Sequence, residues 1–267
     1  MRKFILICLT VLISISYCNV NAYAKEIIPT CNLQEQNTMS TLWYQTSGEA
    51  RALYYQGYNI GQMKLDKALH KKPKNPAVIL DLDETVFNNS PYDAWTVLTE
   101  QGYPAKWEEW VQKAEATALP GAIDFLKYAD KKHVDIYYIS NRTVAQSKAT
   151  LKNLKRIGAP QANINHLLLK KPGEEGKEAR RQQVAQNHEI ILFFGDNLTD
   201  FSGFDNQTVE KRNQTTDEKK EQFGDKLIIF PNPMYGDWEG AIYQYDYTLP
   251  DVEKSQLRRN NLKPFQP

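Results

Sequence analysis

The chain has 267 residues, of which 41% are hydrophobic and 24% charged. This length corresponds to between one and two domains of ~150 residues, and the apolar content excludes a disordered chain. The formal net charge is only +1 at pH 7, so the whole chain has no electrostatic attraction for a nucleic acid polymer or an anionic membrane. Binding partners must therefore be sought in local sites.

The first 24 residues have the three parts of a secretory signal peptide. Arg2 and Lys3 precede an apolar run over residues 4–18, and Ala22-Tyr23-Ala24 has the small residues of a cleavage site. The apolar run is shorter than the ~20 residues of a membrane-spanning helix. We therefore expect cleavage after Ala24 and a mature chain over 25–267 that has no transmembrane segment and is periplasmic or secreted.

Two alternatives to this cleavage remain open. The segment could stay as an uncleaved anchor, or Cys18 could be lipidated as in bacterial lipoproteins, although Tyr17 stands where a small residue is usual. After cleavage at Ala24, Cys31 would be the one remaining cysteine. No internal disulfide could then form, and an ordinary core would have to stabilise the fold.

Five short apolar runs in the mature chain are typical of buried strands. They cover residues 77–80, 134–139, 164–169, 190–194 and 227–230. Helical patterns lie between them, and strands that alternate with helices favour a mostly parallel sheet with right-handed crossovers. The sequence therefore predicts an α/β fold of the doubly wound, Rossmann-like type, with three layers.

Apolar residues recur with helical spacing over residues 40–70, 122–129 and 144–157, so these segments are predicted to be helices. The charged stretch 210–221 has balanced signs and is interpreted as a solvated helix or loop. In the first helix, one cluster of aromatic residues is interpreted as core or helix-packing residues and not as a ligand site: Tyr54, Tyr55 and Tyr58.

Polar side chains gather where the predicted strands end. Ligands bind outside the carboxyl ends of the strands in open α/β sheets. These positions hold four carboxylates, one hydroxyl and one lysine: Asp81, Asp83, Asp196, Asp200, Ser140 and Lys170. Acids next to buried strands are costly unless they are paired or coordinate a cation. Their convergence with a lysine predicts a hard metal ion and an anionic substrate, hence a phosphate.

Asp81 and Asp83 are separated by one residue on an extended segment. Alternate side chains of such a segment share a face, so both carboxylates could address one substrate. One carboxylate can attack phosphorus while the other protonates the leaving oxygen. An Asp-x-Asp pair alone is common in turns and caps, but the acid and lysine at the matching strand ends favour the catalytic interpretation.

Two longer motifs resemble the signatures of the class C bacterial acid phosphatases of the haloacid dehalogenase (HAD) superfamily. The first runs from Ile79 to Tyr92, and the second runs from Ile191 to Phe201. The stretch from Pro231 to Gly240 is also similar, so the resemblance spans essentially the whole mature chain. It implies one HAD-like domain over 25–267, with a small, mainly helical cap formed by residues 34–72 and 86–120.

The resemblance implies a chemical role for each carboxylate. Asp81 would be the nucleophile, and Asp83 would be the general acid and then the base that activates water. One Mg²⁺ per site would be held by the carboxylates of Asp81 and Asp196 and by the backbone carbonyl of Asp83. Asp200 would lie nearby as a water-mediated partner of the metal, unless it only caps a helix.

The same resemblance implies that Ser140 and Lys170 hold the phosphoryl oxygens of the substrate. The simpler alternatives are a capping serine and a solvated lysine. Trp107 and Trp110 share a helix face, which is typical of packing. The resemblance nevertheless implies that Trp107 and Tyr235 hold the base or nicotinamide ring of a nucleotide. Trp110 and Trp238 would then belong to the core.

The expected function is a secreted, Mg²⁺-dependent acid phosphatase that acts on phosphomonoesters such as 5′-nucleotides, including nicotinamide mononucleotide-like compounds. The family also suggests a homodimer. One alternative keeps the fold for dehalogenation or sugar phosphoryl transfer, but dehalogenases need no acid at the position of Asp83. Another is a non-catalytic surface-binding or storage protein, although Asp81, which such proteins lack, is retained.

Overall fold

The structure is a computed structural model, and it describes residues 32–266. The predicted signal peptide, its cleavage site, Cys18 and Cys31 lie outside the described residues. Between residues 32 and 266, no helix has the length and apolar character that a membrane span requires.

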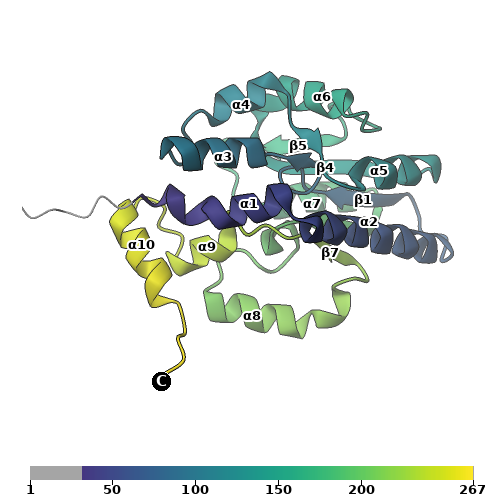
Figure 1. The fold of residues 1–267 in the computed structure, drawn as a ribbon. Helices are drawn as coiled ribbons and strands as arrows, with labels where there is room; N and C mark the ends of the chain where they lie inside the picture. The colour runs from purple at the N-terminus through teal and green to yellow at the C-terminus, as the bar shows by residue number, and fades with distance from the viewer. Residues whose placement is uncertain (1–31, 267) are drawn as a thin grey trace, which may run out of the picture. The chain divides into compact units, whose positions relative to one another are not determined.

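Each of the five predicted apolar runs provides one strand of a parallel five-stranded sheet. The strands are β1 (Pro76–Leu80), β4 (Asp135–Thr143), β5 (Leu167–Lys170), β6 (Glu189–Gly195) and β7 (Leu227–Ile229). Their order is β5-β4-β1-β6-β7, so β1 lies in the centre (Figure 1). Leu80 at the end of β1 is level with Tyr138 of β4 and Phe194 of β6. The predicted parallel α/β fold is confirmed.

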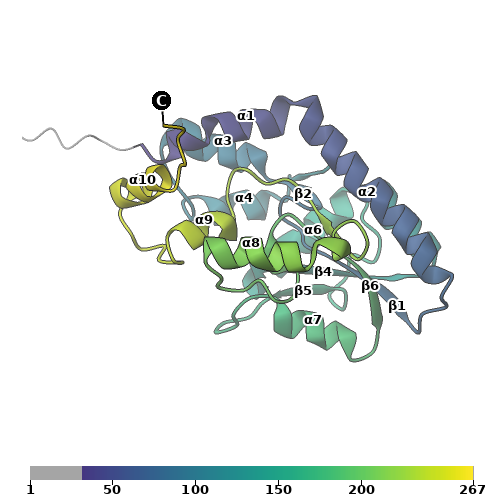
Figure 2. The same ribbon diagram turned by 90° about the horizontal axis from the view of Figure 1, so that it is seen from below.

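Helices cover both faces of this sheet and complete three layers. On one face, α2 (Gly48–Leu69), α5 (Ala122–Lys131) and α6 (Ser147–Arg156) share one buried cluster with the sheet. On the other face, Val184 of α7 (Glu178–Ala185) belongs to a second buried cluster together with Ala77 and Ile79 of β1. Figure 2 shows α2 and α7 on opposite sides of the strands. The core therefore lies between the sheet and its two helical layers.

The first predicted helix, over 40–70, is two helices and not one. α1 (Thr38–Thr46) ends at Ser47, which has an extended backbone and starts α2. The Ser47 hydroxyl accepts a hydrogen bond from the Ala50 N–H at 3.0 Å, which is the usual arrangement of a helix N-cap. The prediction of one uninterrupted helix was wrong because it followed only the apolar periodicity.

The tyrosine cluster of α2 is only partly in the core. Tyr54 and Tyr58 are buried, and their rings lie 4.8 Å and 4.7 Å from the ring of Phe230. Tyr55 is 43% exposed, so it is not a core residue, but it packs beside Gly121 at the start of α5, where a Cβ would lie 3.4 Å from its ring. A residue next to Tyr54 points in a different direction around the helix, away from the sheet.

Further elements complete the chain, and several of them lie at the carboxyl end of the sheet. Before β4 these are η1 (Gln34–Asn37), β2 (Phe87–Asn88), α3 (Ser90–Thr99), α4 (Trp107–Lys113) and β3 (Thr117–Ala118). After β4 they are η2 (Val144–Gln146), η3 (Leu198–Asp200), α8 (Val209–Glu218), η4 (Lys220–Gln222), α9 (Asp237–Ile242) and α10 (Asp251–Asn260). The cap predicted over 34–72 and 86–120 thus contains helices, and its role as a cap stays a prediction.

Candidate active site

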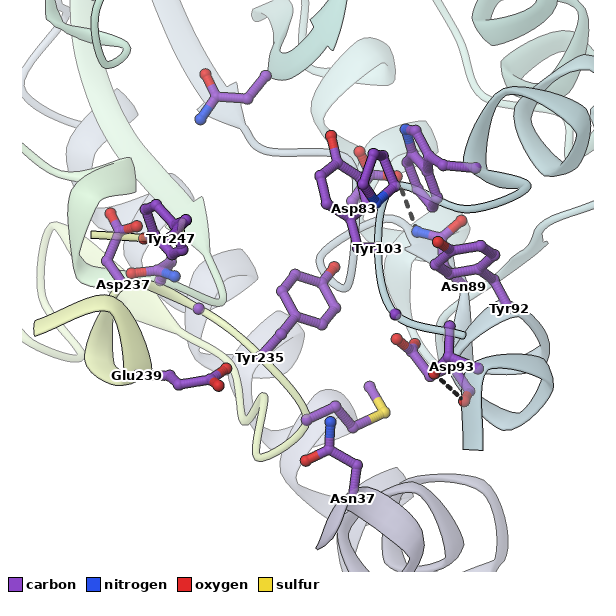
Figure 3. Close-up of a pocket in the computed structure, with 18 of the residues that line it drawn as sticks. Asn37, Asp83, Asn89, Tyr92, Asp93, Tyr103, Tyr235, Asp237, Glu239 and Tyr247 are labelled. Carbon is purple, nitrogen blue, oxygen red and sulfur yellow. Dashed lines mark hydrogen bonds between the residues drawn. The ribbon is translucent and has the colours of Figure 1, made fainter. Parts of the chain in front are cut away.

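A cavity of about 880 Å³ lies at the carboxyl end of the sheet. Six of the predicted site residues line it: Asp81, Asp83, Trp107, Asp196, Asp200 and Tyr235. Figure 3 shows one end of this cavity, with Tyr235 between Asp83 and Glu239. Ser140 and Lys170 are not among the residues that line it.

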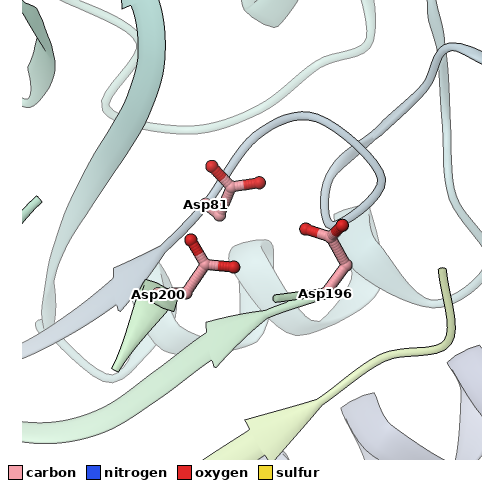
Figure 4. Close-up of side chains that lie close together, drawn as sticks. All are labelled: Asp81, Asp196 and Asp200. Atoms are coloured by element: carbon pink, nitrogen blue, oxygen red, sulfur yellow. The ribbon is translucent and has the colours of Figure 1, made fainter. Parts of the chain in front are cut away.

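Three carboxylates gather at the end of β1 and β6. Asp81, Asp196 and Asp200 each offer an oxygen, and these atoms lie within 4.8 Å of one another (Figure 4). The Asp81 N–H donates to the Phe194 carbonyl at 3.0 Å, which holds Asp81 at the last ladder position between the two strands. Carboxylate oxygens at such spacing are suitable ligands for a hard divalent cation.

Burial makes these carboxylates unfavourable as anions. It raises the pKa of Asp81 to about 7, and the nearby negative charges of Asp200 and Asp83 add to the rise while Lys177 opposes it. Burial likewise raises the pKa of Asp196 well above its usual value, with Asp200 and Asp81 contributing. A bound cation would remove this penalty, so the residues fit the metal site that the sequence predicts.

Gly195 allows Asp200 to reach this site. A Cβ atom at position 195 would lie 2.3 Å from the Cβ of Asp200, a distance that no side chain could accept. Asp200 Oδ2 accepts from the Asn197 N–H at 3.0 Å, so the carboxylate caps η3 as well as facing the site. Asp200 therefore both caps η3 and belongs to the carboxylate cluster with Asp81 and Asp196, so neither interpretation excludes the other.

The lysine of the site is Lys177. Its ammonium contacts Asp81 Oδ1 and lies 2.6 Å from Asp200 Oδ1, and it is buried. Burial opposes its charge, but the carboxylates of Asp200 and Asp81 keep the pKa of Lys177 above its usual value. The expectation that Lys170 would occupy this place is not met. Lys170 ends β5 opposite Thr143 of β4.

Sequence reasoning missed Lys177 because it looked for a lysine directly after a strand. Lys177 instead stands at the N-cap of α7, after the loop that follows β5. A helix start at the carboxyl edge of a parallel sheet is also close to the binding site. That position was the signal that could have identified Lys177.

Asp83 is held by three neighbouring side chains. Arg142 Nη2 donates to Asp83 Oδ1 at 2.7 Å, and Asn89 Nδ2 donates to the same oxygen at 2.8 Å. The Ser140 hydroxyl is fully buried and donates to Asp83 Oδ2 at 3.2 Å. Ser140 therefore contacts the predicted general acid, and its predicted contact with phosphate stays a prediction.

Tyr235 is fixed by a buried acid. Its hydroxyl donates to Glu84 Oε2, and Glu84 Oε1 accepts from the Asn89 N–H at 2.7 Å. Burial raises the pKa of Glu84 well above its usual value, and the charges of Asp93 and Asp83 add to the rise. The ring of Tyr235 is held in the cavity wall, as Figure 3 shows.

The tryptophans divide between the cavity, the core and the surface. Trp107 lines the cavity and lies edge-on to Tyr92, with ring centroids 5.0 Å apart. Trp110 packs against the core and donates to Asn89 Oδ1 at 2.8 Å. Trp238 is 43% exposed, so its assignment to the core was wrong. It lies on the short helix α9, and its indole N–H donates to backbone carbonyls at 3.2 Å.

Comparison with known proteins identifies relatives over most of the chain. The profile of HAD superfamily subfamily IIIB (acid phosphatase) matches residues 9–238. The class C acid phosphatase of Bacillus anthracis is 60% identical, with 88% of this chain and 100% of that chain covered and a TM-score of 0.87. A structure of the B. anthracis class C acid phosphatase with tungstate bound gives a TM-score of 0.88 at the same identity and coverage.

More distant similarity exists to plant proteins. A stem 28 kDa glycoprotein of Glycine max is 27% identical over 149 residues, which is 51% of this chain and 56% of that protein. A stem 31 kDa glycoprotein is 28% identical over 60% of this chain and 59% of its own length. The chain thus spans a little over half the length of these curated relatives. With the profile match and the fold it shares with the Bacillus enzyme, the chain belongs to the acid phosphatases of HAD superfamily subfamily IIIB, the class C group of phosphomonoesterases.

Proposed function

We propose that this protein hydrolyses 5′-nucleotides and related small phosphomonoesters, including nicotinamide mononucleotide-like compounds, through an aspartyl-phosphate on Asp81. The observation that carries the proposal is the position of the Asp81 carboxylate. It offers an oxygen within 4.8 Å of carboxylate oxygens of Asp196 and Asp200, contacts Lys177, and faces a cavity of about 880 Å³. The tungstate in the Bacillus relative supports an oxyanion site of this kind.

The proposed reaction has two steps. In the first, an Asp81 oxygen attacks phosphorus, the bond to the leaving oxygen breaks, and Asp83 gives that oxygen a proton. In the second, Asp83 takes a proton from water, which attacks the aspartyl-phosphate and releases phosphate. Lys177 is distant from both acids in the sequence but contacts Asp81 in the fold. Its positive charge offsets the charge of the phosphoryl oxygens.

A divalent cation completes the proposed site. Asp81, Asp196 and Asp200 would hold it, and we propose Mg²⁺ because hard oxygen ligands suit it. When bound, it supplies positive charge that draws electron density from the phosphoryl group. The lysine and the cation together would balance the buried carboxylates that face the substrate.

Aromatic side chains support a substrate that carries a ring. The cavity wall includes Tyr92, Tyr103, Trp107 and Tyr235. Stacking on aromatic side chains tolerates different bases, because every base has a π face. We therefore propose that Trp107 and Tyr235 contact the ring of the leaving nucleoside and allow broad base specificity.

The direct test is phosphate release from a 5′-mononucleotide by the purified chain 25–267, with Mg²⁺ and then with excess chelator. We expect turnover that the chelator abolishes and Mg²⁺ restores, and an Asp81→Asn variant that folds but has no turnover. Turnover by Asp81→Asn would remove Asp81 as the nucleophile. Binding of Mg²⁺ and nucleotide without phosphate release would favour the alternative, a non-catalytic binding or storage protein.

We also propose export, with the mature chain in the periplasm or secreted. The support is the basic and apolar pattern of residues 1–24. Mass spectrometry of the natural protein should find Lys25 at the amino terminus. A diacylglyceryl group on Cys18 would instead indicate an outer-membrane lipoprotein. The homodimer that the resemblance suggests can be measured on the same material by light scattering.

A further inference from the structure

Arg142 lies near the end of β4 with its guanidinium against Asp83. Its side chain is 1% exposed. Nη2 lies 2.7 Å from Asp83 Oδ1, and Nε lies 3.0 Å from Oδ1 and 3.1 Å from Oδ2. A guanidinium that meets a carboxylate through two nitrogens fixes both the distance and the plane of the carboxylate.

The other nitrogen positions of Arg142 also bind protein groups. Nη1 donates to the Thr150 hydroxyl at 3.4 Å, and Nη2 donates to Asn89 Oδ1 at 3.3 Å. All three nitrogens therefore donate within the protein. Arg142 is among the residues that line the cavity, but each of its nitrogens donates to a protein group, whereas an arginine that holds a substrate phosphate gives its donors to the phosphate.

Two aromatic rings hold the guanidinium in place. Its carbon lies 4.9 Å from the ring centroid of Phe87 and 5.5 Å from that of Trp107. Such cation–π contacts attract a guanidinium to the faces of the rings and so favour this position of Arg142. Trp107 lines the cavity, so Arg142 connects the proposed ring contact with the proposed general acid.

We infer that Arg142 is a positioning residue, which holds Asp83 in the orientation that protonates the leaving oxygen. The inference rests on the proposed role of Asp83. Oδ1 is anchored by the short contacts of Arg142 and Asn89, at 2.7 Å and 2.8 Å. Oδ2 has the longer contacts, at 3.2 Å from the Ser140 hydroxyl and 3.1 Å from Arg142 Nε, and we assign the transferred proton to this oxygen. As the Asp81–phosphorus bond forms and the bond to the leaving oxygen breaks, that proton passes from Oδ2 to the leaving oxygen.

The test compares phenyl phosphate with p-nitrophenyl phosphate. The two leaving groups have the same ring, but phenolate is the stronger base and depends more on the proton from Asp83. kcat/KM is the right quantity, because it includes only the steps up to release of the leaving group. For Arg142→Gln we expect kcat/KM for phenyl phosphate to fall by about 100-fold. The ratio of kcat/KM for phenyl phosphate to kcat/KM for p-nitrophenyl phosphate should fall by about 10-fold.

Three further variants separate this role from a structural one. Arg180 is a matched control, since it is buried and donates to the Ser140 carbonyl and to Asn141 Oδ1, at 2.6 Å and 2.8 Å. Arg180→Gln should lower both activities by the same factor. Arg142→Lys keeps the charge without the two-point contact, and it should also lower the ratio. If Arg142→Gln does not fold, Arg142→Lys takes its place in the comparison of the two substrates.

Asp83→Asn supplies the reference. If Asp83→Asn lowers the ratio and the Arg142 variants leave it unchanged, the inference about Arg142 is overturned while the proposed function stands. If Asp83→Asn leaves the ratio unchanged, the proposed role of Asp83 fails, and the inference fails with it. A fall of the ratio in Arg180→Gln equal to that in Arg142→Gln would show a general structural effect and would also overturn the inference.

Discussion

At the scale of single residues, the site balances buried negative charge against few positive groups. Lys177 contacts Asp81 and lies 2.6 Å from Asp200, while Arg142 pairs with Asp83 at 2.7 Å. Removing one partner of a buried ion pair leaves an uncompensated charge, at a cost of about 3–5 kcal/mol. Each of these cations therefore contributes to stability as well as to the proposed chemistry.

The two candidate lysines can be separated by matched substitutions. Lys177→Met should lower kcat by about 100-fold or more, the typical loss when one group that stabilises a transition-state oxyanion is removed. Lys170→Met should keep kcat within a few-fold, because Lys170 does not line the cavity. Steady-state kinetics on p-nitrophenyl phosphate measures both, with circular dichroism as the control for folding. Equal losses in the two variants would contradict the assignment of Lys177.

Asp93 makes stability depend on pH. Asp93 lines the cavity, and its Oδ2 is buried with no hydrogen-bond partner. Burial raises the pKa of Asp93 to about 7, with a further contribution from the charge of Asp83. Between the unfolded value of about 3.9 and about 7, the folded state binds a proton that the unfolded state has lost, so stability falls as pH rises through this window.

Asp93→Asn removes this titration. We expect the variant to gain stability over the wild type as pH rises from 5 to 8, by about 1–3 kcal/mol. Urea unfolding at both pH values measures the difference. A gain that is the same at pH 5 and pH 8 would show that the raised pKa of Asp93 is not its cause.

At the scale of elements, α2 approaches the sheet closely because two of its contact residues have no side chain. Gly57 and Gly61 are four residues apart and so share a face of the helix. A Cβ at Gly61 would lie 2.6 Å from the ring of Phe194, and one at Gly57 would lie 2.4 Å from the ring of Phe230. These glycines set the distance between the helix and strands β6 and β7.

Gly61→Ala should therefore destabilise the protein although alanine favours helices. The overpacked ring contact costs about 1–3 kcal/mol, against a gain of about 1 kcal/mol in helix propensity. Gly48 is a matched control at the start of the same helix, with no atom within 4 Å of its would-be Cβ. Gly48→Ala should be neutral or slightly stabilising. Urea unfolding that moves in the same direction for both variants would contradict this packing argument.

The elements differ in how far the sequence predicts them. The five strands follow from continuous apolar runs, because a central parallel strand is buried on both faces. The carboxylates of the site follow from their positions after those strands. Lys177 and the helix break at Ser47 could not be found in this way, because they depend on a loop path and on a cap. Arg142 follows the second apolar run, but its pairing with Asp83 is a tertiary contact that the sequence does not show. The exposure of Trp238 likewise depends on where the short helix α9 lies.

At the scale of the whole molecule, both ends of the described chain meet beside the cavity. Arg258 of α10 contacts Glu239 of α9, and it donates to Gln36 Oε1 at 2.9 Å and to the Leu33 carbonyl at 3.3 Å. Figure 3 shows Asp237 and Glu239 on the opposite side of the cavity from Asn89. The first and last described elements thus form one wall of the cavity.

Arg258→Ala should loosen this wall without touching the phosphate end. We expect a loss of about 1–3 kcal/mol in stability and a KM for a 5′-nucleotide that rises several-fold, with kcat nearly unchanged. The KM for p-nitrophenyl phosphate, a smaller ester, should change less. Kinetics on the two substrates measures this, and a loss of kcat on both would place Arg258 closer to the chemistry than the structure does.

The meeting of the two ends has a consequence for synthesis. A ribosome makes Leu33 before Arg258, and it makes β1 and Asp81 in between. The complete cavity wall therefore forms only after α10 has emerged. A chain that lacks α10 would lack part of the wall beside the proposed nucleoside site and would hydrolyse nucleotides more slowly. Nucleotide turnover therefore reports the fraction of molecules that have finished folding.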